Sequence, residues 1–136
     1  MVQTVISKLN SIAHEFGIVI IKVNAGVNDP DVAIVEDKVI FMNISFNTRF
    51  SYIFRLAHEL AHLIDGDTGS QGAYAFSPYS KKLEERHAHE FALNFLAALF
   101  FQDTPVEYRN YINFMELFGL PSYFEDMARE AVMHAG

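Results

Sequence analysis

Apolar residues recur along the first third of the chain with spacings that predict one helix and three strands. They recur every three or four positions over residues 2–16, and Gly17 can end that helix in the left-handed conformation. Residues 18–23 are mostly β-branched, which is the composition of a buried strand. Two further extended segments, residues 32–35 and 38–44, are separated by a short acidic turn and predict a β-hairpin.

The centre of the chain is an apolar run that predicts a buried helix. Residues 47–48 can start this helix and residues 65–66 can stop it, which leaves about four helical turns. Because most sides of this helix are apolar, we expect it to pack between the sheet and other helices. Arg49 and Arg55 are expected near its exposed side as solvated charges.

The second half of the chain predicts further helices. A polar segment, residues 67–80, leads to a strong helical pattern over residues 81–101. Residues 106–118 and 123–133 carry two shorter patterns, separated by a Gly-Leu-Pro turn. We therefore expect an α+β fold with an N-terminal helix, a short antiparallel sheet of about three strands, the central helix, a second long helix and C-terminal helices. A chain of 136 residues has room for one sizeable core, so residues 1–136 are expected to form a single domain.

Composition narrows the class of protein. The sequence has no cysteine, which excludes disulfides, thiolate metal ligands and a cysteine nucleophile. The formal net charge is −7 and the 10 Lys and Arg residues are scattered, so we expect no direct contact with nucleic acid. The longest apolar stretch, Phe91–Phe101, is interrupted by Asn94 and is too short to span a bilayer, and the N-terminus lacks the apolar core of a secretory signal. We expect a cytoplasmic protein that does not bind membranes.

The central helix carries the clearest candidate chemistry, a His-Glu-x-x-His pentad formed by His58, Glu59 and His62. Residues four apart lie on the same helix face, so the two imidazoles can converge on one cation. The carboxylate of Glu59 can then reach a water molecule beside that cation without being a ligand, which is the position of a general base. Burying these ionisable side chains would cost several kcal/mol without a compensating divalent cation. The alternative is a coincidental pattern of two structural histidines and a solvent-facing glutamate.

A third metal ligand is expected from the next helix, because a catalytic zinc ion usually has three protein ligands and one open position. Glu84 and Glu85 lie on opposite flanks of the apolar face of that helix, so either can point inward. His87 and His89 compete for the same role, and spacing alone does not separate these four residues. They can also simply line a hydrated surface.

Two tyrosines of the polar segment, Tyr74 and Tyr79, are further candidates. A loop that follows a metal-binding helix often borders a substrate cleft. Their hydroxyl groups could therefore donate hydrogen bonds to a transition state, although aromatic residues in loops are more often packing anchors.

Three stretches of the sequence together resemble the ImmA/IrrE family of metallopeptidases. They are Ile40-Phe41-Met42-Asn43 before the central helix, Phe54-Arg55-Leu56-Ala57-His58-Glu59-Leu60-Ala61-His62 on it, and Glu85-Arg86-His87-Ala88-His89-Glu90-Phe91-Ala92 after it. The resemblance covers roughly residues 10–100. It implies a small zincin-like metallopeptidase domain.

The resemblance also implies a role for each residue that matches the family motif. In that family a Glu-x-x-Ala-Asn-x-Phe-Ala pattern supplies the third ligand from its first position, which falls on Glu85 here. By the same resemblance, His58 and His62 are ligands of one zinc ion. Glu59 is then the catalytic base. Manganese or iron could occupy the same ligands, because nitrogen and carboxylate donors do not discriminate sharply between these ions.

The sequence departs from the family pattern at two positions. Ala61 stands where the family commonly has Gly, and it is small enough for the same close packing. His89 stands where the family commonly has Asn or Asp. It could be a fourth ligand or a donor that polarises a carbonyl group.

The expected function is that of a zinc-dependent endopeptidase that cuts a protein substrate. Members of the family are associated with phages and mobile elements, where some cut a helix-turn-helix repressor, so the resemblance suggests such a repressor as the substrate. The alternative is a metal-containing regulatory protein that binds its partner without cutting it. A third interpretation is a metal-free helical interaction domain with an accidental pentad.

Overall fold

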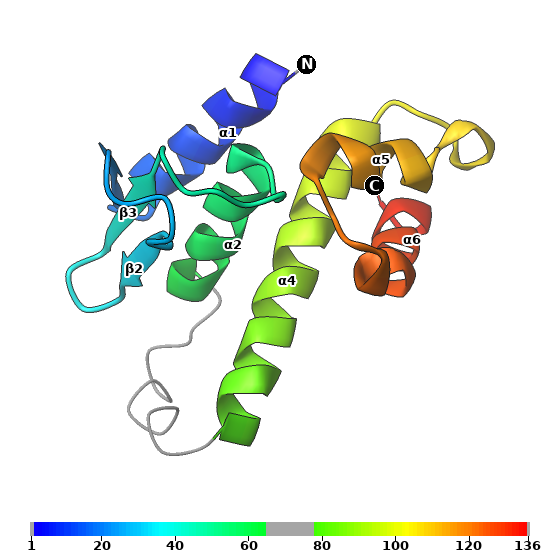
Figure 1. The fold of residues 1–136 in the computed structure, drawn as a ribbon. Coiled ribbons are helices and arrows are strands. Elements are labelled where there is room, and N and C mark those ends of the chain that lie inside the picture. Colours follow the sequence, from blue (N-terminus) through cyan, green and yellow to red (C-terminus); the bar gives the residue numbers. More distant parts are fainter. Residues whose placement is uncertain (1, 65–77, 136) are drawn as a thin grey trace.

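The computed structural model describes the backbone of residues 2–64 and 78–135, and the side chains of residues 3–64 and 85–135 (Figure 1). Within these residues, five α-helices and three β-strands form the predicted α+β fold. In chain order, the elements are α1 (Val2–Glu15), β1 (Val19–Val23), β2 (Val32–Ile34), β3 (Val39–Asn43), α2 (Tyr52–Ile64), α4 (Pro78–Phe101), α5 (Tyr111–Phe118) and α6 (Glu125–Met133). Two single-turn 3-10 helices, η2 (Val106–Tyr108) and η3 (Ser122–Phe124), precede α5 and α6.

Helix α2 lies at the centre of the fold (Figure 1). It packs against α4 on one side and against α1, β2 and β3 on the other. Helix α4 also packs against α6, and α5 packs against both α2 and α6. This arrangement confirms that the central helix is enclosed by the sheet and other helices.

The sheet has the strand order β1-β3-β2 and a mixed strand direction. Strands β2 and β3 pair antiparallel, which confirms the predicted hairpin, whereas β1 pairs parallel to β3, with Val19 opposite Val39. The prediction of an antiparallel sheet is therefore wrong for β1, because the composition of a strand does not encode the direction of its neighbour. The predicted burial of β1 is also wrong, since Val19 is 54% and Ile21 39% exposed. As an edge strand, β1 has one face that no described element covers.

The N-terminal end of α2 is capped by Ser51. The Ser51 hydroxyl accepts a hydrogen bond from the backbone N–H of Phe54 at 3.1 Å. The predicted helix start at residues 47–48 is therefore wrong, because another hydroxyl residue closer to the apolar run takes the cap position. The predicted stop at residues 65–66 lies outside the described residues.

The segment before α2 is tied to the C-terminal end of α5. The backbone N–H of Ser51 donates a hydrogen bond to the carbonyl of Phe118 at 2.9 Å. The Nε of Arg49 donates to the carbonyl of Gly119 at 3.1 Å. Arg49 is exposed, as expected, but it lies before the helix and binds the end of another one.

Capping residues also determine where other helices begin or end. Helix α1 ends at Glu15, and Gly17 follows it in the predicted left-handed conformation, with φ +70°. The predicted helix over residues 106–118 is interrupted, because the Asn110 side chain accepts hydrogen bonds from Ile112 N and Asn113 N and starts α5 there. The last predicted helix is found as α6, preceded by η3. No helix in the part of the chain that the structure describes is long and apolar enough to cross a membrane.

Replacing Gly119 with Ala should destabilise the fold much more than replacing Gly17. Both glycines have φ +70°, so each alanine incurs backbone strain of about 1 kcal/mol. At Gly119 the added Cβ would also lie 1.8 Å from the Arg49 carbonyl oxygen, whereas at Gly17 the described structure leaves open space. We expect Gly119→Ala to lower the free energy of unfolding by on the order of 4 kcal/mol, and Gly17→Ala by about 1 kcal/mol, in urea denaturation. Equal losses would contradict the close approach of α5 to the segment before α2.

Candidate metal centre

His58 and His62 lie one turn apart on the face of α2 that meets α4. The orientation of that face is fixed by the side chains that α2 buries in the core, which are Ile53, Phe54, Leu56, Ala57, Leu60 and Ala61. Glu85 reaches the two histidines from α4. The packing of α2 against α4 therefore brings Glu85 to two histidines that lie 23 positions or more earlier in the chain.

The three side chains converge on one point. The Nε2 atoms of His58 and His62 are 2.9 Å apart. The carboxylate of Glu85 places Oε2 3.2 Å from His58 Nε2 and Oε1 2.8 Å from His62 Nε2. Among the side chains that the structure describes, these three form the group that could hold a metal ion. We call this group the triad.

The donor set of the triad fits a zinc ion. Ligand atoms at about 2.0–2.1 Å from a tetrahedral zinc ion lie about 3.4 Å from one another. The separations of 2.9, 3.2 and 2.8 Å in the triad are close to that value. Two imidazole nitrogens and one carboxylate also leave a fourth position for water or substrate, which is the usual composition of a catalytic zinc site.

Glu59 is the half-buried carboxylate next to the triad on α2. Burial raises the pKa of Glu59 to about 7, and the charges of Asp31 and Glu85 add to this effect. The charges of His58 and His62 act in the opposite direction but do not outweigh burial. A cation held by the triad would lower this pKa further towards its ordinary value. A carboxylate that exchanges a proton near neutral pH is suited to general base catalysis.

The pKa of Glu85 is shifted in the opposite direction from that of Glu59. Burial alone would raise the pKa of Glu85, but the hydrogen bonds and charges of His58 and His62 outweigh burial and hold that pKa well below its usual range. The carboxylate is therefore ionised, as a metal ligand must be. The Glu85 side chain is 39% exposed, whereas those of His58 and His62 are 14% and 15% exposed. The triad thus opens to solvent on its Glu85 side.

His89 packs against the triad without joining its converging atoms. Its ring centroid lies 4.5 Å from that of His58, and the ring also stacks on Phe54 and contacts Phe124, at 6.1 and 4.9 Å. Burial is the main cause that lowers the pKa of His89 to about 4, so the ring is neutral at neutral pH. In this position His89 can restrict the orientation of His58.

The other residues predicted for the site lie elsewhere or are not described. His87 is exposed on α4. Tyr74 lies outside the described residues, and Tyr79 lies in the first turn of α4 among residues whose side chains are not described. The same holds for the side chain of Glu84. The roles of the two tyrosines stay predictions.

Comparison with known protein families agrees with this geometry. The model of a peptidase family, described as the IrrE N-terminal-like domain, matches residues 13–122, a range that includes the whole triad. The chain belongs to this family. It is therefore a metallopeptidase-type domain, in agreement with the resemblance of the sequence motifs. No curated protein and no solved structure gives a significant match to the chain.

This IrrE-like domain contains a buried ion pair that the sequence pattern does not predict. Arg55, expected as a solvated charge, is only 11% exposed, and its Nη1 lies 3.5 Å from Oδ2 of Asp31, which is 4% exposed. The guanidinium also lies over the rings of Phe46 and Tyr52, at 5.6 and 5.9 Å. The expectation for Arg55 is wrong because residues distant in sequence cover this flank of α2, which helical periodicity does not reveal.

Asn43 holds the loop that carries Asp31. Its side-chain amide donates hydrogen bonds to the carbonyls of Gly26 and Asp29, at 2.8 and 2.6 Å, and its Oδ1 accepts from Ala25 N at 3.0 Å. Its backbone N–H donates to Asp31 Oδ1 at 2.7 Å. The sequence signal for this role is a single polar residue at the end of an apolar strand.

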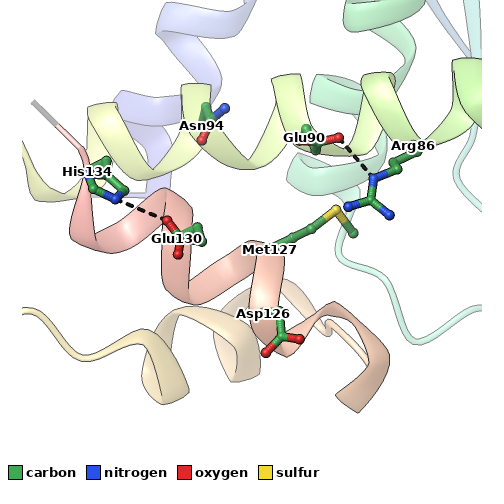
Figure 2. Close-up of a pocket in the computed structure, with 7 residues that line it drawn as sticks. All are labelled: Arg86, Glu90, Asn94, Asp126, Met127, Glu130 and His134. Atoms are coloured by element: carbon green, nitrogen blue, oxygen red, sulfur yellow. Dashed lines mark hydrogen bonds and ion pairs between the residues drawn. The ribbon is translucent and has the colours of Figure 1, made fainter.

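One cavity lies beside α4, and a second, smaller cavity lies beside the triad. A cavity of about 390 Å³ lies between α4 and α6 (Figure 2). Its charged side chains pair over single helical turns, as Arg86 and Glu90 do at 3.3 Å, and it contains no triad residue. A smaller cavity of about 170 Å³ is lined by His58 and Glu59 and therefore belongs to the metal centre.

Replacing Asp31 with Asn should destabilise the domain, because it leaves the buried guanidinium of Arg55 without a counter-charge. We expect the free energy of unfolding in urea to fall by about 3 kcal/mol. The matched control is Asp126→Asn, which removes the carboxylate of the exposed pair with Arg129 and should cost less than about 0.5 kcal/mol. If the two variants are equally stable, Asp31 does not hold Arg55 in place.

Proposed function

We propose that this chain is a zinc-dependent endopeptidase in which His58, His62 and Glu85 hold one zinc ion and Glu59 is the general base. The observation that carries the proposal is the convergence of three ligand atoms beside a half-buried carboxylate, in a chain that belongs to a peptidase family. The donor types and their spacing support zinc over an ion that prefers oxygen ligands alone.

The residues of the site divide the work of peptide hydrolysis. A zinc ion held by the triad supplies positive charge that acidifies water and stabilises the charge developing on the scissile carbonyl group. Glu59 accepts the proton of the attacking water and passes it to the leaving amine. His58 and His62 are held in one orientation because their helix is anchored in the core on its other side. Exposure of Glu85 leaves this edge of the site open to an extended peptide.

Three further residues are candidate hydrogen-bond donors to the transition state. His89, whose side chain the structure describes, contacts the triad through the ring of His58. Tyr74 and Tyr79 are candidates because a hydroxyl donor aimed at the developing negative charge contributes to catalysis of this kind.

As the substrate, we propose a cytoplasmic protein, specifically a helix-turn-helix repressor of a phage or mobile element. The motif resemblance to the ImmA/IrrE family supports this assignment. The net charge of −7 also suits a partner with a basic DNA-binding surface, because opposite charges accelerate encounter.

The purified protein should bind about one zinc ion per chain, and Glu85→Gln should weaken that binding by more than about a hundredfold. Loss of a residue that merely supports a ligand already costs about 10- to 100-fold, so loss of a ligand should cost more. Competition with a chromophoric zinc chelator measures the affinity. The matched control is Glu84→Gln, one position earlier on α4, which should bind zinc like the wild type. The assignment of Glu85 is wrong if the two variants lose affinity equally.

Replacing Glu59 with Gln should abolish cleavage while leaving zinc binding unchanged. The amide cannot accept the proton of the attacking water, and the loss of a general base lowers rates by about a hundredfold to ten-thousandfold. The measurement is mass spectrometry of a repressor encoded beside this gene, incubated with the zinc-loaded wild type or variant. A chelator should stop wild-type cleavage. A stable complex with no fragments would favour a regulatory binding protein, and wild-type protein without zinc would favour a metal-free domain.

A further inference from the structure

The smaller cavity opens directly beside the residues proposed for catalysis. Its volume is about 170 Å³. His58, Glu59 and His89 line it on the side of the metal centre. A substrate side chain that enters this cavity therefore belongs to a residue close to the carbonyl group that reacts.

Three phenylalanines supply apolar walls of the cavity, Phe46, Phe50 and Phe54. The rings of Phe50 and Phe54 stack with centroids 5.4 Å apart, and both contact Phe124, at 5.6 and 5.8 Å. These contacts fix two of the walls. Phe46 instead lies in the segment between β3 and α2, is half-buried and is not part of the core cluster. Changes at Phe46 should therefore alter the cavity more than the fold.

Two of the charged residues that line the cavity, Asp31 and Arg55, are an ion pair. Asp31 and Arg55 pair with each other at 3.5 Å, and both side chains are largely buried. Because their charges offset each other, the pair presents no net charge to an entering group. An apolar side chain that enters between the three phenylalanine rings loses little hydration and buries apolar surface against them.

We propose that this cavity is the subsite that selects a large apolar side chain, such as Leu, Met or Phe, on a substrate residue next to the scissile bond. This inference rests on the proposed peptidase function, since it takes His58 and Glu59 as the reacting centre. The cavity is smaller than the roughly 300–1,000 Å³ of sites that enclose whole small molecules, and it suits a single side chain. Phe46 determines how large that side chain can be.

The test is the cleavage of a degenerate peptide library by the zinc-loaded protein, with products sequenced by mass spectrometry. At one position flanking the cut, the wild type should favour Leu, Met or Phe over Gly, Lys and Glu by about tenfold to a hundredfold. Phe46→Trp fills the cavity and should reduce this preference at least about tenfold, while preferences at other positions stay unchanged. Phe46→Ala should shift the preference towards Phe and Trp. The matched control is Phe16→Trp, an exposed position just after α1, which should behave like the wild type.

A binding measurement separates the subsite from the peptidase function. Zinc-loaded Glu59→Gln protein is titrated with two peptide hydroxamates, which bind zinc directly and carry either a Leu or a Lys side chain. The Leu compound should bind at least about tenfold more tightly, and Phe46→Trp in the same protein should remove the difference. If the compounds are distinguished but no peptide is cut, the peptidase function fails and the subsite stands. Cleavage without any flanking preference, or a preference that Phe46→Trp leaves intact, overturns the subsite.

Discussion

The contact between α2 and α4 is the constraint on which the site depends. His58 and His62 share a helix face through local geometry, but their third partner, Glu85, belongs to a helix that meets them only in the folded chain. A displacement of one residue along α4 would turn the carboxylate by about 100° and take it away from both imidazoles. The apolar side of α2 therefore does more than form a core. It fixes the rotation of the helix, and through it the direction in which the ligands and Glu59 point.

The part of the site that could be predicted from sequence is the part set by local geometry. The spacing of His58, Glu59 and His62 requires only a regular helix, and the apolar run around them indicates one. In the same way, periodicity and turn residues predict helices α2 and α4, the hairpin, and the end of α1 before Gly17. Helix geometry alone does not select Glu85 as the third ligand from Glu84, His87 and His89. The resemblance to a family motif selects it.

The features that the sequence does not predict are set by contacts between distant segments. Strand β1 is as apolar as a central strand, yet it lies at an edge and runs parallel to its neighbour, because its position depends on where the connection to β2 crosses the sheet. Arg55 sits on what periodicity predicts to be a solvated flank, but the loop held by Asn43 brings Asp31 over it. Ser51, which caps α2 in place of an earlier residue, is also bound by the end of α5.

The anchoring of the start of α2 by the end of α5 bears on how the domain assembles during translation. The contact between Arg49 and Gly119 joins positions 70 residues apart. The ribosome therefore synthesises both ligand helices, α2 and α4, before it adds the two residues whose carbonyl groups secure the start of α2. The start of α2 therefore stays unsupported until residues 118 and 119 have been added, although every residue of the triad precedes them in the chain.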